Sequence, residues 1–337
     1  MTKGPGGRRF CGMRTRRPTF SPPFFLPREG TRMRRMAIQY DIRHTTVYRY
    51  SKPVSFGLHR VMFRPRDSHD LRVLATDLQV SPEANTRLIQ DPYSNSVALV
   101  QPLGEATELR IVCSFTIEHV PPSQRDLFTL DPSAEFLPFA YSVQERLDLE
   151  HYLRQHHNDD EQGTLIRWAH QFLQTDKPNS TREVLTRMNA HIGQGFEYKA
   201  RDEEGTQTPL ETLALGSGSC RDYALLMMEA TRRLGIATRF VSGYLYDAAL
   251  DAAAQAQGEP GSMTGAGTTH AWLQAYLPGV GWLAFDPTNN LMGSGQLIRV
   301  GVARDPALAA PISGSWFGDP EAYEGLEATV LVTRREG

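Results

Sequence analysis

The sequence predicts an α+β fold, in which an N-terminal antiparallel β domain precedes a core with a helix packed on an antiparallel sheet. Apolar residues alternate with period two from about residue 39 to 120, then follow helical spacing beyond Pro121-Pro122. Over residues 269–290, two further strand-like runs flank a Pro-Gly turn. With 337 residues, 40% hydrophobic and 22% charged, the chain can bury the cores of two domains. Fully disordered, collagen-like and membrane-spanning classes are disfavoured.

The formal net charge of −2 combines two unlike parts. Residues 1–35 hold ten Lys and Arg residues and one acidic residue, Glu29, which leaves 26 basic and 37 acidic residues beyond them. The segment is rich in Pro, Gly and Ser and lacks the apolar core of a signal peptide. We expect a disordered basic leader here, or sequence upstream of a start at Met33 or Met36. A nucleic-acid-binding arm is the alternative.

The expectations about cofactors and cellular compartment depend mainly on motifs that the sequence lacks. The three cysteines, Cys11, Cys113 and Cys220, are too few and too scattered for a disulfide framework or a CxxC zinc site. The sequence contains no HExxH, Walker, GxGxxG or EF-hand motif. We therefore expect no metal, no cofactor, no nucleic-acid or membrane partner, and a cytoplasmic location.

An antiparallel β domain is predicted over residues 38–121. The even-numbered residues of the segment 40–50 share one face, and Leu109, Ile111, Cys113, Phe115 and Ile117 share another. Cys113 is then a buried small hydrophobic residue and not a nucleophile. His44 on its largely apolar face is expected to be a core histidine and not a ligand.

Helical spacing marks three segments beyond this domain, near residues 143–156, 163–174 and 181–192. Farther on, residues 247–268 contain no aromatic residue and are rich in Ala, Gly and Gln. We expect a mobile loop there, either an active-site lid before His270 or an insertion without function.

A nucleophile is indicated at the start of the next helix. After Cys220 the apolar residues follow helical spacing, and Gly235 is placed to end the helix. A thiol at a helix N-terminus is ionised more easily, because unpaired N–H groups and the helix dipole favour the thiolate. The alternative is that Cys220 is a small core residue at the start of a packed helix.

A histidine and a carboxylate share one face of the hairpin at residues 269–290. If the turn is centred on Pro278, His270 lies directly opposite Asp286. A loop of two or four residues would shift this register. The carboxylate would then hold one imidazole nitrogen and direct the other at a thiol.

These motifs carry a family resemblance. GSGSCRDYALLMMEATRRLGIATRFVSGYL (216–245) followed by THAWLQAYLPGVGWLAFDPTNN (269–290) resembles the papain-like core of the transglutaminase-like superfamily of cysteine enzymes, in its bacterial branch. The segment that includes YDIRHTTVYRY resembles the β-rich N-terminal domain of such proteins. The resemblance implies a catalytic core over residues 140–292. The C-terminal extension, residues 293–337, lies outside the resemblance, and we expect it to return to the core sheet. The resemblance also implies Cys220 as nucleophile, His270 as general base and then acid, and Asp286 as orienting carboxylate.

Roles for neighbouring residues are less directly indicated. Gly218 is expected to give a substrate carbonyl access to the backbone, where the Cys220 N–H donates to an oxyanion. Tyr244 is expected to approach the site, and Trp272 to line it or, more simply, to fill the core. Neither the oxyanion-stabilising Gln of papain-like enzymes nor the Trp of animal transglutaminases is present at its usual place. The second donor is therefore sought among Gln194, Tyr198 and Gln207.

The resemblance implies attack of the Cys220 thiolate on an amide carbonyl of a peptide or protein, either a Gln-like side chain or the backbone. Water would resolve the thioester in a peptidase or amidase, and we favour that outcome. An amine would resolve it in a transglutaminase or ligase. A catalytically silent peptide-binding scaffold is a further alternative. Arylamine acetyltransferases share Cys, His and Asp, but they carry RGGxC where this chain has GSGSC.

Overall fold

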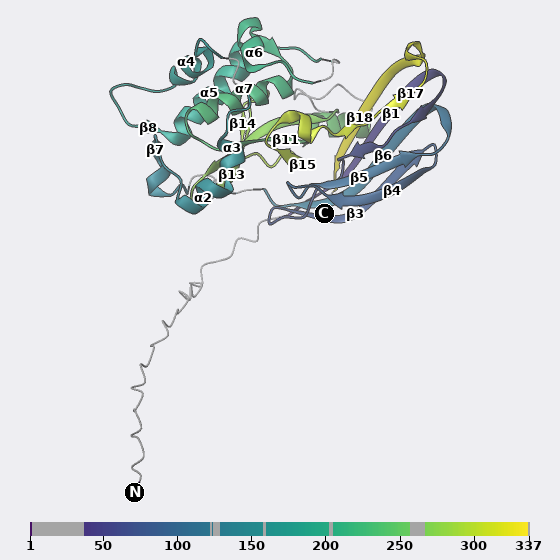
Figure 1. The fold of residues 1–337 in the computed structure, drawn as a ribbon, viewed down its shortest axis with the longest axis horizontal. Coiled ribbons are helices and arrows are strands. Elements are labelled where there is room, and N and C mark those ends of the chain that lie inside the picture. Colours follow the sequence, from purple (N-terminus) through teal and green to yellow (C-terminus); the bar gives the residue numbers. More distant parts are fainter. Residues whose placement is uncertain are drawn as a thin grey trace. The chain divides into compact units, whose positions relative to one another are not determined.

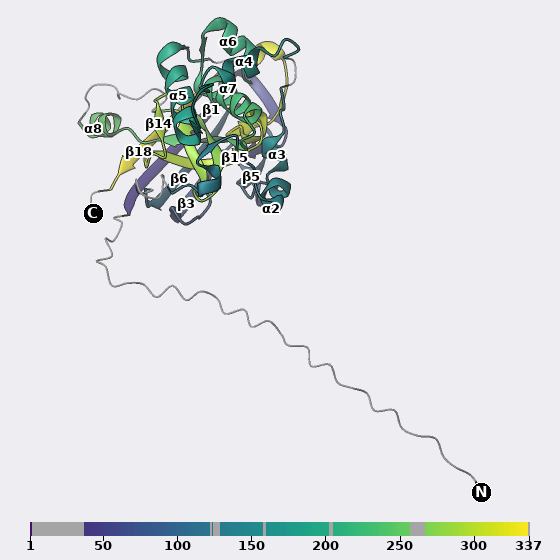
Figure 2. The same ribbon diagram turned by 90° about the vertical axis from the view of Figure 1, so that its left-hand side faces the viewer.

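A computed structural model describes residue 1 and residues 37–121, 123, 129–157, 160–201, 205–256 and 267–335, without the side chains of 253–256. The predicted basic leader, residues 1–35, lies outside the described residues apart from its first residue. Residues from Met36 onward form one unit, which Figures 1 and 2 show from two directions.

The first strand is an interior strand of a five-stranded antiparallel sheet. Its strands are β1 (Ile38–Phe56), β3 (Leu71–Ser81), β6 (Glu105–His119), β17 (Trp316–Phe317) and β18 (Tyr323–Arg334). Residues Tyr40, Ile42, His44, Thr46 and Tyr50 are buried, which confirms the predicted inner face of this strand. The alternation arises because successive side chains of a strand point to opposite faces.

A second sheet packs against the first to form a sandwich. It contains β2 (His59–Val61), β4 (Ala84–Gln90), β5 (Ser96–Pro102) and β16 (Ile312–Ser313). Val61 and Val100 from this sheet share one hydrophobic cluster with Ile111 and Cys113 from the other. Burial raises the pKa of Cys113 to about 12, so this thiol stays protonated and is confirmed as a core residue.

The C-terminal segment is divided between the two parts of the fold. Strand β15 (Leu297–Ala303) joins the core sheet beside β11 (Thr238–Leu245). Strands β16, β17 and β18 instead extend the two N-terminal sheets, and β18 pairs with β1 from Tyr50 to Tyr40. The last strand of the chain therefore pairs with the first strand in the same sheet (Figure 1).

The core sheet has five antiparallel strands, in the order β14-β13-β12-β11-β15. It includes β12 (His270–Leu277), β13 (Gly281–Asp286) and β14 (Leu291–Met292). The helices around it are α2 (Val143–Asp148), α3 (Glu150–Leu153), α4 (Thr164–His170), α5 (Thr181–Gly195), α6 (Pro209–Leu215) and α7 (Cys220–Arg233). Figure 1 shows α4, α5, α6 and α7 gathered on one side of this sheet. Two short pairs complete the core: β7 (Phe136–Leu137) with β8 (Asn179–Ser180), and β9 (Glu197–Tyr198) with β10 (Ser217–Gly218).

Helix α7 runs through the centre of the core and is buried nearly all round. Its C-terminal half carries an ion pair without solvent exposure, between Glu229 and Arg232, while Arg233 binds the same carboxylate. Arg232 also donates to the backbone oxygens of Thr238 and Arg304. These bonds satisfy buried charges that would otherwise be costly, and they hold the helix against β11 and the segment after β15.

The segment expected to be a mobile loop is partly helical. Helix α8 spans Ala248–Ala256, and Asp247 caps it by accepting the N–H groups of Ala249 and Leu250. Asp251 on α8 accepts the backbone N–H of Arg334 on β18, and Figure 2 shows the two elements side by side. The loop prediction was wrong for 248–256, because alanine-rich sequence favours helix once a cap and a docking strand are present. Residues 257–266 lie outside the described residues.

Candidate active site

Helix α7 begins at Cys220, as predicted. Ser219 is the N-cap residue, and both its N–H and its hydroxyl donate to the Asp222 carboxylate at 2.8 Å. Cys220 is 8% exposed and stands at the positive end of the helix dipole.

Asp222 holds the segment around this helix start in place. Its carboxylate is fully buried and accepts hydrogen bonds from the Arg201 guanidinium at 3.0 Å and from the Gln207 backbone N–H at 2.7 Å. Removing Asp222 would leave several buried donors without an acceptor. Its contacts are those of a residue that shapes the loop before the nucleophile.

Glycine is required at two positions before Cys220 for different structural reasons. Gly216 ends α6 with φ of 59°, a left-handed conformation that glycine adopts without strain. At Gly218, a Cβ atom would lie 2.9 Å from the Asp222 Cβ and 3.2 Å from the Gln207 Oε1. The missing side chain at Gly218 thus makes room for the Asp222 carboxylate. A contact of Gly218 with substrate stays a prediction.

The hairpin that carries His270 and Asp286 has a register that differs from the predicted one. Leu277 pairs with Gly281, so the turn is centred on Gly279 and not on Pro278. Val280 donates to the Leu277 oxygen, and Gly279 takes the third turn position with φ of 86°, which a non-glycine residue would resist. The prediction that His270 lies directly opposite Asp286 was therefore wrong.

The shift keeps both side chains on one face. Continuing the observed register places position 272 opposite Asp286, and His270 lies two residues farther along the same side of β12. Diagonal neighbours of this kind are within reach of long and aromatic side chains. His270 Nε2 and Asp286 Oδ2 lie 2.9 Å apart, and both side chains have no solvent exposure.

Asp286 is held by hydrogen bonds from its own loop as well as from His270. The backbone N–H of Thr288 donates to Oδ1 at 3.0 Å, and the Asn289 side-chain amide donates to Oδ2 at 3.0 Å. Burial opposes the charged form, but His270 and these donors outweigh it and lower the pKa of Asp286. The sequence analysis missed Asn289, and the Asp-Pro-Thr-Asn order, which is typical of a carboxylate-capped turn, was the available signal.

The imidazole of His270 is prepared to carry a proton. Burial alone would lower its pKa, but the Asp286 carboxylate and, to a smaller extent, the Cys220 side chain raise the pKa of His270 to about 10. Its Nδ1 atom is buried and has no hydrogen-bond partner among the described residues. The structure therefore brings Cys220, His270 and Asp286 together. Nε2 of His270 is bound to the Asp286 carboxylate, and its Nδ1 is available for another partner.

The stability of the folded chain is expected to depend on pH through His270. Since its pKa is raised above the unfolded value of about 6.5, the stabilisation is complete below that pH and is lost as pH rises through about 10. His270→Gln should therefore destabilise the chain more at pH 6 than at pH 10.5, measured by urea denaturation. His170→Gln, at an exposed position on α4, should show no such difference. An equal effect of His270→Gln at both pH values would contradict the raised pKa.

Tyr244 does not approach the site. Gly243 pairs with His270, so Tyr244 projects from the opposite face of β11. Its hydroxyl lies 2.9 Å from His44 Nδ1 and donates to the Phe63 oxygen at 3.1 Å, within the core of the N-terminal sandwich. The expectation for Tyr244 was wrong, whereas His44, whose pKa burial lowers to about 3, is confirmed as a core histidine.

Trp272 and Gln194 lie at two borders of the site. Trp272 is 1% exposed and fills a small core cluster, with its ring stacked 5.9 Å from that of His270. Gln194 is exposed in the last turn of α5. Its neighbour Gly193 lies so close to the Pro287 oxygen that a Cβ would be 2.4 Å away. The end of α5 thus packs on the loop that follows Asp286, but among the described residues Gln194 makes no hydrogen bond to Cys220, His270 or Asp286.

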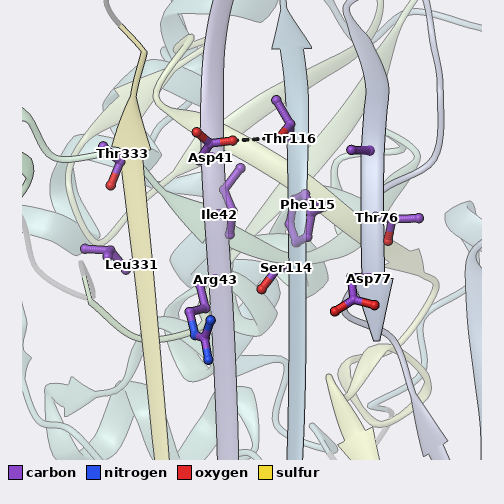
Figure 3. Close-up of a pocket in the computed structure, with 11 residues that line it drawn as sticks. Asp41, Ile42, Arg43, Thr76, Asp77, Ser114, Phe115, Thr116, Leu331 and Thr333 are labelled. Carbon is purple, nitrogen blue, oxygen red and sulfur yellow. Dashed lines mark hydrogen bonds between the residues drawn. The ribbon is translucent and has the colours of Figure 1, made fainter. Parts of the chain in front are cut away.

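A pocket of about 360 Å³ lies elsewhere, on the outer face of the N-terminal sheet (Figure 3). Asp41 and Arg43 of β1 stand at its centre, and Asp41 accepts the Thr116 hydroxyl at 2.6 Å. None of its lining residues comes from α7, β12 or β13, so this pocket is separate from the candidate active site. Among the described residues, no group of three or more His, Cys, Asp or Glu side chains is arranged to hold a metal ion. No helix in the described ranges is long and apolar enough to cross a membrane.

The chain is similar to mycobacterial proteins over most of its length. It is 28% identical over 328 residues to an uncharacterized protein of Mycobacterium tuberculosis strain H37Rv, covering 93% of this chain and 96% of the relative. It is 24% identical over 294 residues to an uncharacterized protein of Mycobacterium leprae, covering 86% and 97%. The crystal structure of a "Putative Cysteine Protease" from Cytophaga hutchinsonii has the same fold, with a TM-score of 0.63, 19% identity and coverage of 89% of this chain and 91% of that one.

Two family models match the two parts of the fold. Residues 40–118 match the bacterial transglutaminase-like N-terminal region, which lies within the β sandwich. Residues 166–287 match the transglutaminase-like superfamily model, a range that contains Cys220, His270 and Asp286. The chain therefore belongs to the transglutaminase-like superfamily and carries the N-terminal region of its bacterial members.

Proposed function

We propose that this protein is a cysteine-dependent acyl-transfer enzyme that acts on amides of peptides or proteins. The observation that carries the proposal is the buried His270–Asp286 pair, with Nε2 and Oδ2 2.9 Å apart and Nδ1 without a partner, next to a cysteine at a helix start. A base oriented by a third group beside a thiol is the arrangement that nucleophilic catalysis requires.

In the proposed resting state the thiol proton already lies on His270 Nδ1, and in the reaction the Cys220 thiolate attacks the amide carbonyl carbon. The C=O electron pair moves to oxygen and forms a tetrahedral intermediate. When the pair returns, the C–N bond breaks and the amine leaves with the proton from His270. Asp286 stabilises the imidazolium that exists between these steps, and the α7 dipole stabilises the thiolate.

Water is the proposed acceptor of the acyl group. His270 removes a proton from water, which attacks the thioester and releases the acid and the Cys220 thiol. Exclusion of water would be needed to favour an amine acceptor. Tyr198, whose phenol responds to the charge of Cys220, is 37% exposed, which supports access of solvent to this side of the site.

Mass spectrometry of a peptide mixture incubated with the protein and methylamine tests this function. Cleavage, deamidation and methylamine incorporation give different mass changes, and we expect the first or second in the wild type and none in Cys220→Ala. Cys113→Ala, which removes the buried thiol of the sandwich, is the matched control and should retain activity. Incorporation of methylamine alone would contradict hydrolysis and indicate acyl transfer to an amine. No mass change in the wild type would favour a silent scaffold.

The substrate is proposed to be a peptide or protein with a Gln-like or backbone amide. We also propose a cytoplasmic location, supported by three scattered cysteines of which Cys113 and Cys220 are free thiols. Fractionation of cells with detection of the protein by antibody tests the location, and recovery in a periplasmic or extracellular fraction would contradict it.

A further inference from the structure

The proposed acyl transfer needs two hydrogen-bond donors for the carbonyl oxygen that becomes negative. One is the backbone N–H of Cys220, since the first N–H groups of a helix have no acceptor inside it. Nothing described so far supplies the other. The assignment of this second donor rests on the proposed function.

Strand β9 lies directly beside the segment that leads into Cys220. It runs parallel to β10, with Tyr198 opposite Gly218. The Glu197 N–H donates to the Gly216 oxygen and the Lys199 N–H donates to the Gly218 oxygen, both at 2.9 Å. Backbone hydrogen bonds on either side of Tyr198 therefore fix this residue opposite Gly218, which lies two residues before the nucleophile.

The Tyr198 ring extends over the face of α7 that carries Cys220. It lies edge-on to the Tyr223 ring, with centroids 6.4 Å apart and an interplanar angle of 76°. Tyr223 is three residues after Cys220, so the two residues share one face of the helix. Tyr198 is 37% exposed, so a bound substrate can reach its side chain.

The electrostatic surroundings agree with this placement. Burial, with a smaller contribution from the Cys220 and Asp286 charges, raises the pKa of Tyr198 to about 12. The phenol therefore keeps its proton at neutral pH, which a hydrogen-bond donor requires.

The other candidates lack the strand pairing that fixes Tyr198, although Gln207 Oε1 would lie 3.2 Å from a Cβ at Gly218. Gln207 uses its side-chain oxygen to accept the Thr212 hydroxyl at 3.1 Å, and its backbone N–H is bound to Asp222. Gln194 is exposed at the end of α5 without a bond to the central residues. Neither shares the fixed pairing with Gly218 that holds Tyr198.

We infer that Tyr198 is a catalytic residue whose phenol donates a hydrogen bond to the oxyanion formed when Cys220 Sγ adds to the amide carbonyl. The C–S bond forms as the C=O π pair moves to oxygen, and this oxygen then accepts from the Cys220 N–H and the Tyr198 Oη–H. Tyr198 keeps its proton throughout. When the C–N bond breaks, the electron pair returns to the carbonyl and the hydrogen bonds weaken.

Tyr198→Phe removes this donor and keeps the ring. We expect kcat for the peptide mixture to fall about 10²- to 10³-fold with little change in KM, as for loss of one oxyanion donor. Binding of a capped tripeptide aldehyde, which forms a tetrahedral adduct with the thiol, should weaken by at least tenfold. Alkylation of Cys220 by iodoacetamide creates no oxyanion and should stay within about twofold. Tyr323→Phe, at an exposed tyrosine of β18, is the matched control.

The outcomes separate this inference from the proposed function. Unchanged turnover and adduct formation in Tyr198→Phe overturn the role of Tyr198 while the function stands. A parallel loss of alkylation and turnover also overturns it, because the phenol would then act on the thiol or on folding and not on the oxyanion. A wild-type protein that neither reacts with iodoacetamide faster than a free thiol nor forms the aldehyde adduct overturns both.

Discussion

Replacing His270 by alanine is expected to lower the rate of amide turnover by on the order of 10⁴-fold or more. The residue supplies the proton acceptor for the thiol and the proton donor for the leaving amine, so its loss affects both halves of the reaction. Alkylation of Cys220 by iodoacetamide should slow as well, since the imidazolium that stabilises the thiolate is gone. Comparing turnover with the alkylation rate across pH 5 to 9 measures both effects.

Folding must be kept apart from catalysis in this experiment. His270 is fully buried and its removal leaves a cavity beside Trp272, so His270→Gln, which retains a donor toward Asp286, is the second variant. His170→Ala on α4 controls for the general effect of removing a histidine. If His270→Gln folds and turns substrate over at the wild-type rate, the assignment of the base is wrong.

Two substitutions of Asp286 are expected to separate its effect on the orientation of His270 from its effect on the free energy of unfolding. Asp286→Asn keeps the shape of the side chain but changes which His270 nitrogen carries the proton, and we expect a loss in kcat of about 10⁴-fold. Asp286→Ala leaves His270, Thr288 and Asn289 without their buried acceptor. We expect it to lower the free energy of unfolding by about 3–5 kcal/mol at pH 7.

Urea denaturation and single-turnover kinetics of both variants measure the two effects. Because the pKa of Asp286 is lowered in the folded chain, its contribution to stability is present above about pH 4 and is lost as pH falls through the lowered value. The stability difference between the wild type and Asp286→Ala should therefore shrink in acid. Asp305→Ala, at a capping carboxylate that follows β15, is the control for turnover and should retain it. Full activity in Asp286→Asn would exclude an orienting role.

Local physical rules were sufficient for much of the fold. The inner face of β1, the start of α7 at Cys220 and the burial of Cys113 follow from side-chain periodicity, which depends on residues close in sequence. The cap of α8 was also visible in Asp247, but the alanine-rich segment that follows was interpreted as a loop. That helix docks on β18 through Asp251 and Arg334, which are 83 residues apart in sequence.

The candidate site was predicted in its residue types but not in its contacts. Cys220, His270 and Asp286 were identified by motif and resemblance, while the turn centre on Gly279 displaced their register by two positions. Tyr244 was misplaced because alternation along β11 reveals two faces without saying which one meets the N-terminal sandwich. Asn289 was missed because its importance comes only from the carboxylate that its loop surrounds.

The sequence by itself determined the periods of the strands and helices, the helix start beneath Cys220 and the side chains available for acyl transfer. These depend on backbone geometry and on neighbours within a few residues. Only the tertiary structure decided that Nε2 of His270 faces Asp286, that β18 closes the N-terminal sheet, and that Tyr198 stands beside Gly218. Each of these contacts joins segments that are distant in sequence. They are brought together by burial of apolar surface and by pairing of buried polar groups, and a local sequence pattern does not say which distant segment a residue will contact.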